Sequence, residues 1–261
     1  MDTQYILKQY VDTGIAIPEY QFNKLNNNLK KTYIRKRGIA IVDGFNIMEY
    51  EVDFLPQEVF VKSLKKNGDN IKYIKNPSEE LKLTAVKQNG SAIRHINNPS
   101  EQVQLLAIKK YFKEIQHIKN PSEEVQLAAV NMDADAIKYI KNPTENVQLV
   151  AVKQPIYDEK SVIRFIKKPS EQVKLAAVTQ DGRSIRYIKN PSEQVQLAAV
   201  NRRSNLIQYI QNPTERVQLV AVEKNNKNIN YIKNPTDKVM EYVRKQKELN
   251  ENLNRIKKLL T

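Results

Sequence analysis

One segment of 22 residues recurs along most of this chain and limits what the chain can fold into. Its fullest form, Pro191 to Asn212, reads PSEQVQLAAVNRRSNLIQYIQN, and close copies lie on both sides. The period is 22 residues everywhere except at one place, where it is 26. The copies open at Pro77, Pro99, Pro121, Pro143, Pro169, Pro191, Pro213 and Pro235. Self-similarity at a period of about 20 to 50 residues is typical of a solenoid, in which each repeat packs against its neighbours.

Each repeat predicts two short helices. In the first, Asn190 is the expected N-cap, Pro191 the first helical residue and Glu193 the acid of a capping box. Apolar residues cover well over half of this helix, and among its central residues only Gln196 is expected to face water. A polar break follows, and then a second helix of about a turn and a half. Helices this short are marginal in water, so stacking must stabilise them.

The predicted fold is all-α: a right-handed α-solenoid of two-helix, 22-residue repeats with a small helical N-terminal cap and a long C-terminal helix. Residues 1–55 do not follow the period and form the predicted capping domain. Residues 39–55 fit either a helix or a hairpin, and we favour the helix because it would cap a helical stack. Residues 56–234 hold about eight repeats, with a four-residue insertion near 155–158. Residues 235–261 form the predicted C-terminal capping and amphipathic helix.

Composition argues against several functional classes. Six glycines are scattered singly and there is no cysteine, so we expect no glycine-rich phosphate loop and no thiolate chemistry. No catalytic or metal-binding constellation is found, and we therefore expect a protein that is not an enzyme and needs no cofactor or metal.

The chain has no run of 18 apolar residues and its N-terminus does not read as a signal peptide, which predicts a cytoplasmic protein with no membrane contact. The formal net charge of +14 favours acidic partners, either a protein surface or nucleic acid.

The repeat unit, NPSEEVQLAAV followed by AIKYI, resembles the short α-helical repeats of proteins from low-GC bacteria, their phages and large DNA viruses. More distantly it is similar to HEAT and leucine-rich-variant solenoids. The resemblance covers about residues 56–240, and it is specific for architecture without indicating a reaction. A phage setting would imply a protein in a bacterial host cell that binds and inhibits a host factor, such as a defence nuclease.

Two columns of cations follow the second helices. One suits the negative end of the helix dipole and consists of Lys75, Lys119, Lys141, Lys167, Lys189 and Lys233. The other lies beside a column of aromatic residues, an arrangement used by grooves that bind single-stranded nucleic acid. Its members, the candidate nucleic-acid-binding residues, are Lys72, Arg94, Lys138, Arg164 and Arg186. A solvated charged face is the alternative reading. His95 and His117 stand in the aromatic column, and we interpret them as packing residues.

The segments between the two helices of each repeat vary and are predicted to lie on one edge, where solenoids often bind partners. Some carry the aromatic and arginine residues that are enriched at interface hot spots. The candidate partner-binding residues are Lys109, Lys110, Tyr111, Phe112, Lys113, Ile156, Tyr157, Arg202 and Arg203. Local repacking of these segments is the alternative. The favoured function is thus a scaffold that binds an acidic protein surface, and the second hypothesis is a nucleic-acid-binding solenoid.

The C-terminal segment carries apolar residues in alternating steps of three and four, as in a coiled coil. The seam consists of Val239, Tyr242, Gln246, Leu249, Leu253, Ile256 and Leu260. Its first turns are expected to cap the last repeat. For the distal residues Leu249, Leu253, Ile256 and Leu260 we expect self-association as a weak homodimer, with capping or docking onto a bound partner as alternatives.

Overall fold

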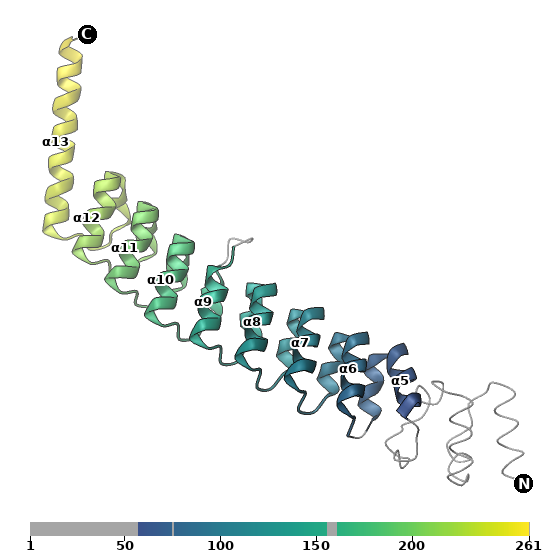
Figure 1. The fold of residues 1–261 in the computed structure, drawn as a ribbon. Helices are drawn as coiled ribbons and strands as arrows, with labels where there is room; N and C mark the ends of the chain where they lie inside the picture. Colours follow the sequence, from purple (N-terminus) through teal and green to yellow (C-terminus); the bar gives the residue numbers. More distant parts are fainter. Residues whose placement is uncertain (1–56, 75, 156–160, 261) are drawn as a thin grey trace, which may run out of the picture. The chain divides into compact units, whose positions relative to one another are not determined.

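The computed structural model describes residues 57–74, 76–155 and 161–260. The predicted N-terminal capping domain, including the choice between helix and hairpin for residues 39–55, lies outside them. Within the described residues every regular element is a helix and no strand occurs. The predicted all-α repeat fold with a long C-terminal helix is therefore confirmed (Figure 1).

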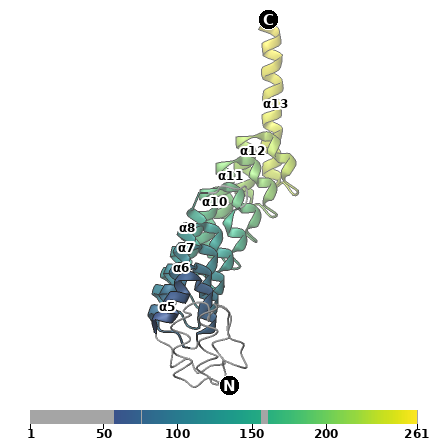
Figure 2. The same cartoon turned by 90° about the vertical axis from the view of Figure 1, so that its right-hand side faces the viewer.

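The chain divides into two compact units, Met1–Met132 and Asp133–Thr261. In the first, α-helices alternate with 3-10 helices: α5 Gln57–Lys66, η3 Gly68–Tyr73, α6 Glu79–Gln88, η4 Gly90–His95, α7 Glu101–Lys110, η5 Phe112–His117 and α8 Glu123–Met132. The second continues the alternation: η6 Ala134–Tyr139, α9 Glu145–Lys153, η7 Val162–Phe165, α10 Glu171–Gln180, η8 Gly182–Tyr187, α11 Glu193–Arg202, η9 Ser204–Tyr209, α12 Glu215–Lys224, η10 Asn226–Tyr231 and α13 Asp237–Leu260. Within each unit the α-helices form one layer and the 3-10 helices the other (Figures 1 and 2).

The second helix predicted for each repeat is a 3-10 helix. In one repeat, the ten residues of α11 are followed by the extended Arg203 and then by the six residues of η9. The 3-10 form is favoured in pieces this short. The helix ends with a hydrogen bond from the amide of its C-cap residue, Ile210, to the Ile207 carbonyl at 3.0 Å, and both isoleucines are buried. Apart from the repeat with the insertion, where α9 ends at Lys153 and η7 begins at Val162, the variable segments are therefore the last turn of one helix and the first turn of the next, with a single residue between them.

The predicted N-cap was also wrong. Ser192 is the N-cap of α11, and its hydroxyl accepts a hydrogen bond from the Val195 amide at 3.3 Å. Asn190 instead has φ of 47°, a left-handed conformation that asparagine tolerates better than most residues. The helix thus begins at Glu193, two residues later than expected.

The recurring glutamates do not form capping boxes, because each is the first residue of its helix. Several instead accept a hydrogen bond from the N-cap serine of the next repeat: Ser100 to Glu79, Ser122 to Glu101, Ser170 to Glu145 and Ser192 to Glu171. Each of these hydroxyls therefore caps its own helix and also bonds to the preceding repeat. A carboxylate at this position also interacts favourably with the helix dipole.

Gln196, expected to face water, is buried. Its Nε2 donates to the carbonyl of Pro191 at 2.9 Å, and its Oε1 accepts from the Thr214 amide at 3.3 Å. Gln218 bonds in the same way one repeat later, to Pro213 and Thr236. We call the short segment between a 3-10 helix and the next α-helix a connector. Each of these glutamine side chains bonds to backbone groups of two neighbouring connectors, which is why a polar residue suits the core there.

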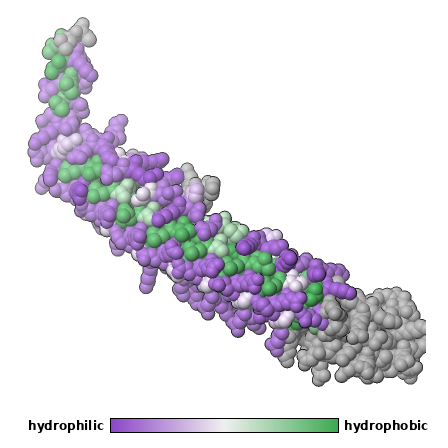
Figure 3. Space-filling model, in the orientation of Figure 1, coloured by the Kyte–Doolittle hydropathy of each residue, from purple (hydrophilic) through white to green (hydrophobic). Residues whose placement is uncertain are grey.

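The core of each repeat comes from both layers. In α11 the side chains of Val195, Ala199 and Val200 are fully enclosed. By contrast, Leu197 and Ala198, which also belong to the apolar part of this helix, are only half-buried. Figure 3 shows hydrophobic surface, in green, over the repeats and on the distal half of α13.

Candidate basic groove

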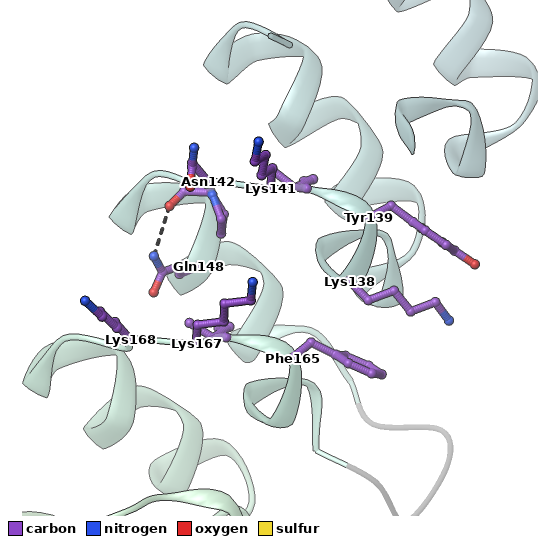
Figure 4. Close-up of a pocket in the computed structure, with 11 residues that line it drawn as sticks. Lys138, Tyr139, Lys141, Asn142, Gln148, Phe165, Lys167 and Lys168 are labelled. Carbon is purple, nitrogen blue, oxygen red and sulfur yellow. Dashed lines mark hydrogen bonds between the residues drawn. The ribbon is translucent and has the colours of Figure 1, made fainter. Parts of the chain in front are cut away.

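In η6, η7 and η8 of the second unit, a cation directly precedes an aromatic residue at the end of the 3-10 helix. A cavity of about 470 Å³ lies between η6 and η7 and the connectors that follow them. Lys138, Tyr139 and Phe165 come from the helices, and Lys141, Lys167 and Lys168 come from the connectors (Figure 4). None of the described residues that line this cavity is acidic.

A second cavity of about 380 Å³ adjoins the first and shares Ile166, Lys167 and Lys168 with it. It adds Arg164, Lys174, Lys189 and Tyr187. We call the two cavities together the basic groove. Its charged lining consists of Lys138, Lys141, Arg164, Lys167, Lys168, Lys174 and Lys189, and again none of the described lining residues is acidic.

Acidic side chains just outside the groove balance part of this charge. Lys138 Nζ donates to Asp135 at 3.1 Å, and this hydrogen bond raises the pKa of Lys138, so the side chain stays charged. Lys174 lies 3.6 Å from Glu171. By contrast, Lys141, Lys167 and Lys168 are exposed and form no ion pair with any described residue. These three lysines are thus available to an anionic ligand.

The cations also contact the aromatic rings. Lys138 Nζ lies 5.1 Å from the Tyr139 ring centre and 5.6 Å from that of Phe165, and Arg164 lies 4.4 Å from the same Phe165 ring. Farther along the unit, Arg186 stacks 4.3 Å from the Tyr209 ring and donates to its hydroxyl at 2.8 Å. Cation–π contacts of this kind hold the basic side chains against the surface.

In the first unit, cations of the same column also contact an aromatic ring or an acidic side chain. Lys72 lies over Tyr73 at 4.7 Å, while Arg94 forms a 3.0 Å ion pair with Asp69 and donates to His95 Nε2. Burial, and then the neighbouring Arg94 guanidinium, lower the pKa of His95, so the ring accepts that bond as a neutral imidazole. A cavity of about 330 Å³ there is lined by Arg94, His117 and Lys119, and its other polar lining residues are amides.

The predicted nucleic-acid column is therefore split. Lys138 and Arg164 line the basic groove, and Arg186 covers the next ring in the same unit. Lys72 and Arg94 belong to the first unit.

Some of the lysines that the sequence assigned only to helix dipoles also line the groove. Lys141, Lys167 and Lys189 lie in the connectors beyond the 3-10 helices and line the groove. The adjoining pair Lys167-Lys168, beside the insertion, was the signal in the sequence.

The predicted partner-binding segment around Tyr111 is exposed. Lys109 and Lys110 end α7, Tyr111 is 59% exposed between the two helices, and Phe112 is half-buried at the start of η5. Lys113 lies 5.9 Å from the Phe112 ring. The segment thus combines an exposed ring with three cations.

Of the other predicted partner-binding residues, the structure describes Arg202 and Arg203. Ile156 and Tyr157 lie outside the described residues. Arg202 ends α11, and its Nη1 donates to the carbonyl of Thr179 in the preceding repeat at 2.5 Å. This bond gives Arg202 a structural role that the sequence did not indicate. Arg203 is exposed and precedes η9.

No three His, Asp or Glu side chains of residues 57–74, 76–155 and 161–260 are grouped as metal ligands. In the same ranges, no helix has both the length and the apolar character needed to cross a membrane. No protein-family model, no curated protein and no solved structure matches this chain.

Proposed function

We propose that this protein is a non-enzymatic scaffold that binds an extended acidic segment of another protein in the basic groove. The observation that carries this proposal is the lining of the groove, which has seven Lys and Arg side chains and no acidic residue among the described ones. Like charges held this close repel one another, and an anionic ligand relieves that repulsion.

The form of the groove supports an elongated ligand. Its two cavities succeed one another along the repeats and share Lys167 and Lys168. A chain that lay across both would meet cations from three successive connectors, those holding Lys141, Lys167 and Lys189. Flexible acidic side chains can adapt to lysines, which act as point charges with rotatable donors.

Single-stranded nucleic acid is the second candidate, favoured by the rings of Tyr139, Phe165 and Tyr187 in the groove lining. Bases stack on aromatic faces in such grooves. We rank it second because the protein's own cations already contact two of these rings. Phe165 is approached by both Lys138 and Arg164, so a base would have to displace them.

A charge reversal in the groove tests the proposal. The variant Lys167→Glu with Lys168→Glu should weaken binding of a fluorescent peptide of a dozen alternating Asp and Glu residues at least about tenfold, as measured by anisotropy. The matched control is Lys227→Glu with Lys247→Glu, which changes the net charge equally at two exposed sites outside the groove. The control should lose less than about threefold.

The same titration with an oligothymidylate of a dozen residues separates the two candidates. Tight binding of the oligonucleotide alone, lost in the groove variant, would replace the first proposal with the second. Equal losses in the groove variant and its control would show that net charge alone attracts the ligands, and the groove would then have no part in function. Circular dichroism confirms that both variants keep the wild-type helix content.

A further inference from the structure

The C-terminal helix α13 extends far beyond the repeats that it caps. Its first turns contact α12 and η10, with Val239 fully buried and Tyr242 and Val243 half-buried. From Lys247 to Leu259 every side chain is exposed. Figure 1 shows this distal part projecting from α12. The cap therefore uses only the beginning of the helix.

The distal part nevertheless carries an apolar stripe. Leu249, Leu253 and Ile256 are 52%, 45% and 52% exposed, and they continue the steps of three and four that begin at Val239. Leu259, beside the stripe, is 84% exposed. Apolar residues repeating in this way form the seam of a coiled coil, in which a second helix covers them. An isolated amphipathic helix would leave this seam in water.

We propose that residues 249–260 pair with the same segment of a second copy of this chain, and that the two helices run antiparallel. The orientation follows from the docked turns. The seam lies on the same face as Val239, and that face is covered at its base by α12 and η10 of the same chain. In a parallel pair, the partner's α12 and η10 would lie beside the seam at the same end of the helix pair as those of the first chain, and the two would compete for the same space. An antiparallel partner places them at the opposite end.

The register follows from the seam. Aligning Leu253 with Ile256 of the partner subunit also aligns Leu249 with Leu260 of the partner subunit, which makes every layer apolar. Sliding the helices by one heptad would instead bury Gln246 against Ile256 of the partner subunit, at the cost of an unpaired amide. In the apolar register Asn250 flanks Lys257 of the partner subunit and Asn252 flanks Leu259 of the partner subunit, so no like charges meet.

Sedimentation velocity over a concentration series tests the pairing with the full chain. Wild type should shift from monomer to dimer as concentration rises, and Leu253→Asp should raise the dissociation constant at least about 100-fold. The matched control is Asn254→Asp, which places the same carboxylate one residue away on the outer face and should leave the dimer intact. A wild type that stays monomeric at every concentration overturns the proposal, including a monomer that instead binds vesicles of anionic lipid.

The absence of native cysteine allows the orientation to be measured by disulfide trapping. In the antiparallel register two copies of residue 249 lie about 16 Å apart along the helix axis, beyond the reach of a disulfide. Leu249→Cys should therefore remain unlinked, while a mixture of Leu253→Cys with a mass-tagged Ile256→Cys should give the mixed covalent dimer. Efficient homodimeric cross-linking of Leu249→Cys would show a parallel pair and overturn the proposed orientation.

Discussion

At the scale of single residues, the informative position is the one between the two helices of a repeat. Asn and Asp there cap the 3-10 helix that follows, as when Asn89 Oδ1 accepts from the Ser91 amide at 3.1 Å. Asn67, Asp133, Asp181 and Asn225 do the same. Tyr111 and Arg203 occupy this position without a capping bond. Both are exposed, so packing does not compensate for the missing cap, and a surface role explains them best.

Restoring the cap should therefore stabilise the protein. Tyr111→Asn and Arg203→Asp are each expected to raise the free energy of unfolding by about 0.5–1 kcal/mol in urea titrations, because each supplies an acceptor to an unpaired amide. Tyr111→Ala, which supplies none, is the control and should give no gain. If neither capping variant gains stability, the two residues are held by contacts that outweigh a cap, and their surface role loses its support.

At the scale of elements, the last residue of several α-helices forms a side-chain hydrogen bond to the α-helix of the preceding repeat. Gln88 donates to the carbonyl of Lys66, Arg202 to that of Thr179 and Lys224 to that of Asn201. These carbonyls lie in the last turn of the preceding α-helix, where backbone acceptors have no partner within the helix. The side chain thus completes a helix end and links two repeats.

Neighbouring arginines provide a matched test of this link. Arg202→Ala should lower the free energy of unfolding by about 0.5–1.5 kcal/mol, whereas Arg203→Ala should leave it nearly unchanged. Arg202→Lys should keep most of the stability, because Lys224 makes the equivalent bond one repeat later. Thermal or urea unfolding measures all three. Equal effects of the two alanine variants would contradict the assigned roles.

Much of the fold was predictable because the 22-residue period and the apolar positions around Val195 define the first helix of each repeat. The 3-10 form was not, since two isoleucines three residues apart fit either kind of short helix. Ser192 was overlooked as the N-cap because Asn190 and Pro191 offer an equally familiar pattern. The column of cations predicted Lys138 and Arg164 of the basic groove, but the part of the connector lysines was missed. Lys141 and Lys167 lie 26 residues apart in sequence and converge only once the repeats stack.

At the scale of the molecule, charge is distributed unevenly between the two units. Residues 133–261 hold 24 Lys and Arg against 14 Asp and Glu, a net charge of +10 out of the total +14. This field acts over about a Debye length, roughly 8 Å at physiological salt, and draws anions toward the whole unit. The groove differs because its lysines touch a bound ligand. The field should therefore govern association, and the groove contacts should govern dissociation.

Stopped-flow kinetics can separate these two contributions with the variants already described. Both Lys167→Glu with Lys168→Glu and its control, Lys227→Glu with Lys247→Glu, remove the same net charge. Both should therefore slow association of the acidic peptide to a similar extent at low salt, and added salt should diminish this effect. Only the groove variant should speed dissociation, by at least about tenfold, because it removes contacts made in the complex. A control variant that dissociates equally fast would mean that the ligand is held by the field of the whole unit, and that Lys167 and Lys168 have no special place in binding.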